Sequence, residues 1–417
     1  MEYRKIPFSP PDVGELEIEY ISKAVKSGWI TTGPRVKELE KKIAGYIGVN
    51  RCVCLNSQTA CGEMALRLLG IGSMSEGIDG RYGSADDEVI TCAYTYTASA
   101  SVVHHVGAKL KLVDCQKNDV HLDYEALENA INEKTKAIIA VDLGGIPCDY
   151  DRIFEIVKKK KSLFKPSNAL QSALGRIAVI SDAAHAFGGI YKGKMIGSIA
   201  DFTGFSFHAV KNFTTAEGGA LSWRSFNGIS DDEIYRYAQL YSLHGQSKDA
   251  YVKAQFGSWE YDIEGLWYKC NMTDITAAMG LAQFERYPAI LKRRREIIEK
   301  YDAAFKQINI DVARHYTEDY LSSGHLYFTF ITGADEEKRN RLYFEMGENG
   351  VMTNVHYKPL PLFTGYQKLG FIIKDYPNAY NLYKKELTLP LNTCLTNEDV
   401  DYIIEKYRNV IGTTDEK

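Results

Sequence analysis

Strand-like and helix-like segments alternate along the first half of this 417-residue chain, from about residue 36 to residue 225. Short apolar runs predict strands at residues 51–55, 88–91, 109–113, 136–141 and 176–181. The segments between them predict helices at residues 34–45, 59–69, 96–106, 123–132 and 149–160. Strands that alternate with helices usually pair in parallel, so this order predicts an α/β fold with a mostly parallel sheet and helices on both faces.

Two polar stretches interrupt this order, at residues 73–87 and 158–175. The first is rich in Gly, Ser and Asp, and the second begins with a run of four lysines. A long loop in a compact domain is either functional or poorly ordered. Two interpretations stay open for both stretches, a surface loop without a role and a loop that approaches the substrate or a subunit interface.

The pattern changes beyond residue 265. A helical stripe of apolar residues begins there, at Ile275, Ala278, Met279 and Ala282. Pro288 is expected to break or kink this helix, and a charged helix is expected to follow it. From His325 a mixture of short strands and helices predicts a smaller α+β domain. We therefore expect a large domain over residues 1–265 and a smaller domain over residues 266–417.

Charge and hydropathy exclude several classes of partner. The formal net charge of −4 does not favour nucleic acid or an anionic membrane surface. No apolar run is long enough to span a bilayer. The N-terminal residues MEYRKIPFSPPD lack the apolar core of a secretory signal. These features predict a cytoplasmic protein with no membrane or nucleic-acid partner.

Eight cysteines are spread along the chain, and no two of them form a C-x-x-C pair. Cys52 and Cys54 lie two residues apart in an apolar run, which places both on one face of the predicted strand. Buried reduced thiols are the expectation, because free cysteine is commonly buried and the cytosol disfavours disulfides. A metal site at this pair is the alternative.

The stretch from residue 179 to residue 221 is the one most typical of catalysis. A strand-like run ends on Asp182, and Lys211 follows 29 residues later in FSFHAVKNFTTAEGG. A lysine among aromatics, hydroxyls and glycines suits a Schiff base, and a carboxylate at a strand end suits the ring nitrogen of pyridoxal phosphate. Two alternatives stay open on spacing alone, namely a solvated surface lysine and an aspartate that caps a helix beginning at residue 183.

The motifs DAAHA, SFHAVKN and AEGG together resemble those of the DegT/StrS family of sugar aminotransferases. The lysine region is most similar to the UDP-4-amino-4-deoxy-L-arabinose aminotransferase type. The resemblance covers nearly the whole chain, from WITTGP at residues 29–34 to the region around His356. It implies the aspartate-aminotransferase fold (fold type I), in which a large domain holds pyridoxal phosphate and a smaller domain closes over it.

The resemblance implies four roles around the cofactor ring. Lys211 would form the Schiff base and, once the amino donor displaces it, would move a proton at the substrate carbon. Asp182 would pair with the ring nitrogen. His185 would lie near the ring and its phenolic oxygen, and Tyr96 would stack on the ring. A structural histidine and an ordinary packed tyrosine are the alternatives for the last two.

The resemblance also implies phosphate, interface and substrate residues. A turn before a helix, with its amides and hydroxyls, would hold the phosphate together with a serine of the FSFH motif, giving Ser57, Gln58, Thr59 and Ser206. In the family, the loop that reads YKCNMTD here reaches the partner's cofactor phosphate. This implies a homodimer with shared sites and points to Lys269 and Asn271. Substrate contacts are implied for Thr32 and His356.

Two positions depart from the family pattern. Asp142 stands where many relatives carry histidine, and Ser181 replaces the usual glutamate before the DAAHA motif. The first departure is expected to alter the substrate pocket. The second is expected to have little effect.

The activity implied is transfer of an amino group from an amino acid, with glutamate expected, to a keto sugar linked to a nucleotide. Its product would be an aminosugar of the kind found in lipopolysaccharide or surface glycans. One alternative is a sugar dehydratase of the same family, although those enzymes replace the lysine by histidine. The other is a regulator that binds pyridoxal phosphate without turnover.

Overall fold

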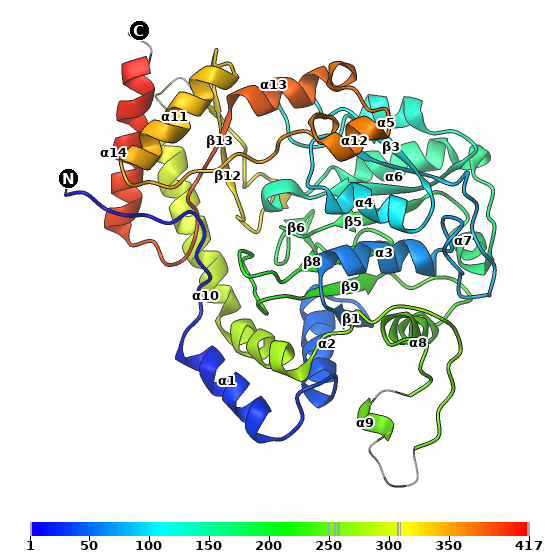
Figure 1. The fold of residues 1–417 in the computed structure, drawn as a ribbon. Helices are drawn as coiled ribbons and strands as arrows, with labels where there is room; N and C mark the ends of the chain where they lie inside the picture. Colours follow the sequence, from blue (N-terminus) through cyan, green and yellow to red (C-terminus); the bar gives the residue numbers. More distant parts are fainter. Residues whose placement is uncertain are drawn as a thin grey trace.

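The computed structural model describes residues 2–248, 250–253, 256, 259–306, 308 and 310–414. Among them, seven strands form one sheet in the order β1-β9-β8-β5-β4-β2-β3 (Figure 1). The strands are β1 Cys52–Leu55, β2 Glu88–Cys92, β3 Lys109–Val113, β4 Thr135–Val141, β5 Ala178–Asp182, β8 Phe202–Ser206 and β9 Gly219–Trp223. From β3 to β8 all neighbours pair in parallel, whereas β9 is antiparallel to β8 and to β1. The predicted mostly parallel sheet is confirmed.

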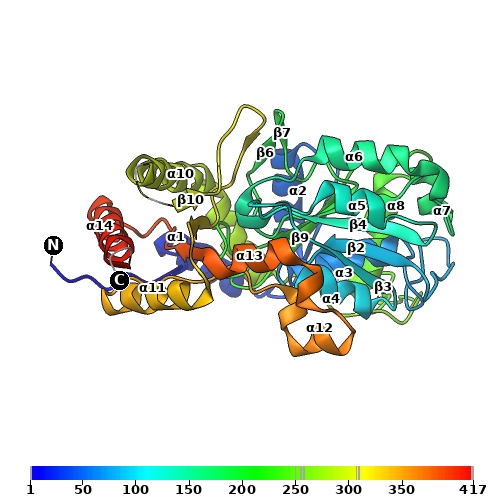
Figure 2. The ribbon, with the colours of Figure 1, turned by 90° about the horizontal axis from the view of Figure 1, so that it is seen from above.

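Helices cover both faces of this sheet (Figures 1 and 2). One face packs against α2 (Pro34–Ile47), α5 (Tyr124–Ala130) and α6 (Tyr150–Lys159). The other packs against α3 (Gln58–Leu68), α4 (Ala98–His105) and α8 (Asp231–Ser242). Alternate strand residues supply the two cores, because successive side chains of a strand point to opposite faces.

Strand β1 shows this alternation. Val53 and Leu55 are buried in the core beneath α3, and Cys52 and Cys54 are buried in the core beneath α2. The two cysteines therefore lie buried on one face of the strand, as their spacing predicts. Burial raises the pKa of both thiols, so both stay protonated near neutral pH.

The two polar stretches, residues 73–87 and 158–175, meet at the C-terminal end of α3. Asn168 and Gln171, at the beginning of α7 (Ala169–Leu174), each donate a side-chain N–H to the carbonyl of Leu69 at 2.8 Å. The carboxylate of Asp79 accepts from the backbone N–H of Ala169 at 2.7 Å. Asn168 and Gln171 thus satisfy a backbone carbonyl that is left unpaired at the end of a helix. At a rise of 1.5 Å per residue, this end of α3 lies about 16 Å from its N-terminal end. These contacts hold the two stretches to each other and to the end of α3.

A smaller antiparallel sheet lies beside the large one, with strand order β10-β12-β13 (Figure 2). Its strands are Ile310–Val312, Tyr327–Ile331 and Glu386–Leu389, and it packs with α11 (Glu336–Glu348) and α14 (Asn397–Thr414) in a third core. The N-terminal segment joins this part, since Ile6 pairs with Val351 and Arg4 forms an ion pair with Asp399. The helices α12 (Thr364–Lys368) and α13 (Pro377–Lys385) connect β12 and α11 to β13 along the chain.

Further elements lie outside the two main sheets and their cores. They are α1 (Glu15–Lys26), α9 (Ala250–Lys253) and a three-stranded sheet of β6 (Ile190–Tyr191), β7 (Lys194–Met195) and β11 (Tyr320–Leu321). No helix among the described residues combines the length and the apolar character that a bilayer crossing requires.

A long helix, α10 (Asp274–Phe305), connects the large and the smaller part (Figure 1). It packs on α1 and α2 near its start and on α14 further along. Of the predicted break or kink at Pro288, the break is wrong, because the helix continues through that residue, and the kink stays a prediction. Tyr287 and Ile290 are buried on either side of Pro288, and this packing offsets the one backbone N–H that proline lacks. The proposed domain boundary at residues 265 and 266 stays a prediction.

Candidate active site

The candidate site lies at one edge of the large sheet, where β4, β5 and β8 end and α3 begins. Ligands of parallel sheets bind outside the carboxyl ends of the strands. A cavity of about 630 Å³ opens at this edge. Nine of the predicted residues line it, from several separate segments: Ser57, Gln58, Thr59, Tyr96, Asp182, His185, Ser206, Lys211 and His356.

Asp182 is the last residue of β5 and is only 5% exposed. Its carboxylate accepts from the Ser99 hydroxyl at 2.6 Å and from the backbone N–H of Ala184 at 3.2 Å. Burial raises the pKa of Asp182, while Ser99, Ala184 and the charge of Lys211 oppose the rise. A turn and not a helix follows Asp182, so the helix-cap alternative is wrong.

Lys211 follows β8 in a turn that returns to β9, and its side chain lies in the cavity wall. The turn is closed by backbone hydrogen bonds from Phe207 to Gly218 and from Thr215 to Phe207, both at 2.8 Å. Burial lowers the pKa of Lys211 to about 8, and the charge of Asp182 opposes this shift. A lysine in this range is partly an uncharged amine near neutral pH, which an ordinary solvated lysine is not.

His185 is neutral and has a defined tautomer. Its Nδ1 accepts from the backbone N–H of Gly144 at 3.1 Å, and its Nε2 lies 3.4 Å from the Tyr357 hydroxyl. Burial lowers the pKa of His185 well below its usual value, and the charge of Lys211 adds to the effect. Because a neutral imidazole has one donor and one acceptor, the proton of His185 is on Nε2.

The start of α3 also lines the cavity. Ser57 is the N-cap of α3, and its hydroxyl accepts from the backbone N–H of Ala60 at 3.1 Å. Gly219 at the start of β9 allows the strand to pass close by, since a Cβ there would lie 2.6 Å from the Ser57 carbonyl carbon. The first N–H groups of a helix have no partner inside it, so this turn can bind an anion.

Thr32, Lys269 and Asn271 do not line the cavity of their own chain. They lie together instead. The Thr32 hydroxyl donates to the carbonyl of Met272 at 2.6 Å and accepts from the Asn271 amide, and Lys269 donates to the Asn271 side-chain oxygen. The substrate role for Thr32 and the roles of Lys269 and Asn271 at a partner's cofactor phosphate therefore remain predictions.

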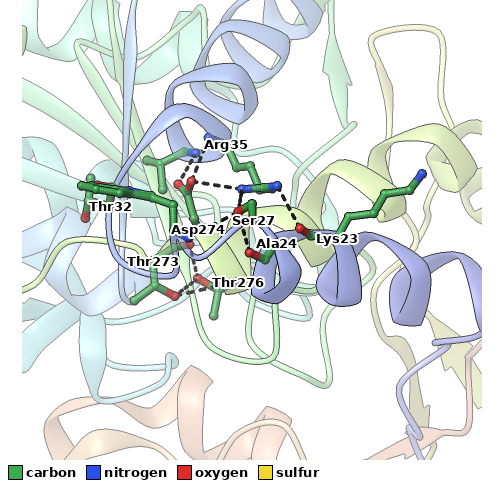
Figure 3. Close-up of polar contacts among 10 residues, drawn as sticks. Lys23, Ala24, Ser27, Thr32, Arg35, Thr273, Asp274 and Thr276 are labelled. Atoms are coloured by element: carbon green, nitrogen blue, oxygen red, sulfur yellow. Dashed lines mark hydrogen bonds and ion pairs between the residues drawn. The ribbon is translucent and has the colours of Figure 1, made fainter. Parts of the chain in front are cut away.

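The segment with Thr32 and the segment with Lys269 and Asn271 are joined through Asp274 (Figure 3). Its buried carboxylate accepts from the backbone N–H of Arg35 at 3.2 Å and of Val36 at 3.0 Å, at the start of α2. The Arg35 guanidinium lies 3.7 Å from the same carboxylate and also contacts Ser27 and Lys23. Asp274 is also the first residue of α10, which Thr273 caps, so its carboxylate holds the start of α2 against the start of α10.

Among the residues missed by sequence reasoning, three lie around Asp182 and His185. Ser99 binds Asp182, Tyr357 contacts His185, and the ring of His325 lies 4.3 Å from that of His185. Helical spacing could have indicated Ser99, which lies one turn after Tyr96 in the predicted helix. Tyr357 follows the predicted His356 directly, whereas no local signal marks His325.

The two residues that depart from the family pattern, Asp142 and Ser181, are hydrogen-bonded to each other. The Ser181 hydroxyl donates to Asp142 Oδ2 at 2.8 Å, and the Tyr150 hydroxyl donates to the same oxygen at 2.7 Å. The backbone N–H of Cys148 donates to Asp142 Oδ1 at 2.9 Å. Burial raises the pKa of Asp142 to about 6 against these three hydrogen bonds. Asp142 is fully buried and also lines the cavity, so its expected effect on the substrate pocket stays a prediction.

The donors in the cavity fit pyridoxal phosphate. The start of α3 with Ser57 and Ser206 suits a phosphate, Asp182 suits a ring nitrogen, and the Lys211 amine suits an aldehyde. Tyr96 lines the cavity with a side chain left 59% exposed, which a stacked aromatic ligand would cover.

Comparisons with known proteins agree with this fit. Spore coat polysaccharide biosynthesis protein SpsC of Bacillus subtilis is 36% identical, over 98% of this chain and 98% of its own. Spr1654 of Streptococcus pneumoniae, provisionally named a sugar aminotransferase, is 52% identical in its PMP form, with a TM-score of 0.93 over 98% of this chain and 99% of that one. Its PLP form superimposes with a TM-score of 0.92.

Helicobacter pylori PseC, an aminotransferase involved in the biosynthesis of pseudoaminic acid, is 26% identical with a TM-score of 0.83, over 98% of this chain and 100% of that one. The sequence profile of the DegT/DnrJ/EryC1/StrS aminotransferase family matches residues 11–408. The predicted fold type, the dependence on pyridoxal phosphate and the aminotransferase class are confirmed. This chain belongs to the DegT/DnrJ/EryC1/StrS aminotransferase family.

Proposed function

We propose that this enzyme transfers an amino group from glutamate to a keto sugar linked to a nucleotide, and that it works as a homodimer with shared active sites. The observation that carries the proposal is the convergence of Lys211, Asp182 and the start of α3 on one cavity. Such an arrangement places an amine, a ring-pairing acid and a phosphate site within reach of one ligand.

The bound cofactor supplies an aldehyde that combines with amines and a ring that withdraws electrons. Lys211 contributes the amine that anchors it and, once the donor has displaced that amine, carries a proton to and from the substrate carbon. The lowered pKa of Lys211, about 8, suits this exchange because both protonation states are accessible. Asp182 holds a proton at the ring nitrogen, and the Nε2–H of His185 faces the cavity as a donor.

A polar cavity mouth supports a sugar substrate. His208 and Glu217 lie there 3.5 Å apart, and Asn354 and His356 line the wall that the smaller part contributes. Sugar hydroxyls need both donors and acceptors, and these four side chains supply them. The names of SpsC and PseC, which refer to polysaccharide and pseudoaminic acid biosynthesis, support an aminosugar product for a surface glycan.

Charge supports a contribution from a second subunit. Lys211 is the only lysine or arginine among the described residues that line the cavity. Glutamate brings two carboxylates and a nucleotide sugar brings phosphates, so the ligands carry more negative charge than one chain neutralises here. The segment with Lys269 and Asn271 lies outside its own cavity, and a partner's cavity is the place that we propose for it.

The donor half of the proposal can be tested with the holoenzyme alone. Addition of glutamate is expected to change the absorbance of the bound cofactor and to release stoichiometric 2-oxoglutarate, with aspartate and alanine as control donors. A panel of nucleotide-linked keto sugars should then restore the spectrum and yield an aminosugar. An unchanged spectrum with every donor would favour the regulator. A product that has lost water but gained no nitrogen would favour the dehydratase.

The shared site can be tested by mixing two inactive proteins. Lys211→Ala and a Lys269→Ala/Asn271→Ala double variant are each expected to be inactive, because each lacks one half of the site. After subunit exchange, half of the dimers are mixed and each has one intact site, so activity should recover to about one quarter of the wild-type value. Mixed dimers without activity, verified by affinity tags on both chains, would refute a shared site.

A further inference from the structure

His356 lines the cavity, and one of its two ring nitrogens, Nδ1, has a side-chain hydrogen-bond partner. Its Nδ1 lies 2.9 Å from the Thr388 hydroxyl, whereas no partner of Nε2 is found among the described residues. Burial and the charge of Lys211 lower the pKa of His356 to about 3, so the ring is neutral at working pH. A neutral ring presents either an N–H or a lone pair at Nε2, and the partner of Nδ1 decides which.

Thr388 is a link between His356 and a buried acid. Its hydroxyl lies 2.5 Å from Glu386 Oε1, and the other carboxylate oxygen, Oε2, accepts from the backbone N–H of His356 at 2.7 Å. Glu386 is wholly buried at the start of β13. Because Oε2 already accepts a hydrogen bond, any proton on this carboxyl group is on Oε1, facing Thr388.

The single hydroxyl proton of Thr388 can serve only one of its two neighbours. When Glu386 is ionised, Thr388 donates to it and accepts from the Nδ1–H of His356, which leaves a lone pair on Nε2. When Glu386 is protonated, it donates to Thr388, which then donates to Nδ1, and the ring proton is on Nε2. The change releases one proton from Glu386 to water, while the ring moves its own proton between nitrogens through water with no net change.

We propose that Glu386 and Thr388 are positioning residues that set which nitrogen of His356 carries the proton. They thereby decide whether the sugar meets a hydrogen-bond donor or an acceptor at this wall. This inference rests on the proposed function for the identity of the ligand. The protonated form of Glu386 presents an N–H to a carbonyl or hydroxyl oxygen of the sugar, and the ionised form presents a lone pair to a hydroxyl.

The surroundings of Glu386 place this change near neutral to alkaline pH. Burial raises the pKa of Glu386 to about 8, and the hydrogen bonds from Thr388 and His356 and the charge of Arg339 oppose the rise. Arg339, on α11, donates to the backbone carbonyl of Glu386 at 3.2 Å. Among the described residues, three tyrosines with raised pKa values also interact electrostatically with this carboxyl group, Tyr94, Tyr357 and Tyr407.

The tautomer of His356 can be read directly. Nitrogen-15 spectra of the histidine-labelled holoenzyme distinguish Nδ1–H from Nε2–H, and a His356→Gln variant assigns the signal. Between about pH 6 and about pH 10 the wild-type ring is expected to pass from Nε2–H to Nδ1–H. His185 is the internal control, because the backbone N–H of Gly144 holds its tautomer and its signal should not change.

Substitutions distinguish control of the His356 tautomer from a purely structural role of Glu386 and Thr388. Glu386→Gln keeps an acceptor for the His356 N–H and offers Thr388 a permanent donor, so His356 should remain Nε2–H at every pH. Thr388→Val should abolish the pH dependence, and Thr388→Ser should restore it. A wild-type ring that keeps one tautomer throughout, or a Glu386→Gln ring that still changes, would overturn the proposal.

Kinetics then test the effect on the sugar. At a pH above the change of the His356 tautomer, Glu386→Gln and the wild type should differ by about tenfold in KM for the sugar, with the KM for glutamate unchanged. A tenfold difference corresponds to about one hydrogen bond. An equal KM for the sugar in both proteins would contradict the specificity role. Failure of the proposed function is a distinct result, since the tautomer change occurs without any sugar present.

Discussion

Replacement of Lys211 by alanine is expected to lower the transamination rate by at least about 10³-fold, or about 4 kcal/mol. The variant loses the amine that anchors the cofactor and the group that carries the proton at the substrate carbon. No other lysine or arginine among the described cavity-lining residues can replace it. Single-turnover measurements with glutamate report this loss without interference from product release.

Two controls make the Lys211 prediction specific. Lys211→Arg keeps the positive charge but not a nucleophilic amine, so it should be as inactive as the alanine variant. A small primary amine added to Lys211→Ala should restore part of the proton transfer. Borohydride reduction of the wild-type holoenzyme followed by peptide mapping should place the cofactor on the Lys211 peptide. An adduct on another lysine, or full activity in the alanine variant, would disprove the assignment.

Replacement of Asp182 by asparagine is expected to reduce kcat by about 10²- to 10³-fold, the usual cost of removing a buried electrostatic partner from a reacting system. Asparagine preserves the shape: its one amide oxygen can accept from Ala184 and its NH2 can donate to the Ser99 hydroxyl, but it carries no charge to hold a proton on the ring nitrogen. The donor half-reaction, followed by cofactor absorbance, measures this effect.

Ser99→Ala provides the matched control for Asp182. It removes the 2.6 Å hydrogen bond to the carboxylate but leaves the charge, so the pKa of Asp182 should rise further and kcat should fall by only about tenfold. A mild effect of Asp182→Asn, equal to that of Ser99→Ala, would mean that the carboxylate is merely structural.

The large sheet was predictable because its signals are local. Each predicted strand from β1 to β5 is present within two residues of its expected bounds, since a buried strand is a short apolar run between polar turns. The antiparallel course of β9 has no such signal, because pairing direction depends on a partner far along the chain. The continuity of α10 through Pro288 was likewise hidden, since it depends on burial of Tyr287 and Ile290.

The residues of the site were predictable where they belong to short linear motifs. Asp182, Lys211 and the turn at Ser57 come from strand ends and helix starts, which meet at one edge of the sheet. Ser99 reaches Asp182 across 83 residues, and Glu386 reaches His356 across 30, so no motif contains either pair. The Asp142–Ser181 hydrogen bond shows the same limit, because two separate departures from a family pattern form one contact.

The uninterrupted α10 has a consequence for how substrates reach the cavity. Its Tyr287 hydroxyl donates to the Phe187 carbonyl at 2.5 Å, and its Arg294 donates to the carbonyls of Gly324 and Leu391 at 3.1 and 3.0 Å. The first bond holds α10 to the large part and the other two hold it to the smaller part, each at about 1 kcal/mol. Substrates therefore reach the cavity between two parts that one helix holds together, and we expect any closure of the smaller part to carry the second half of α10 with it.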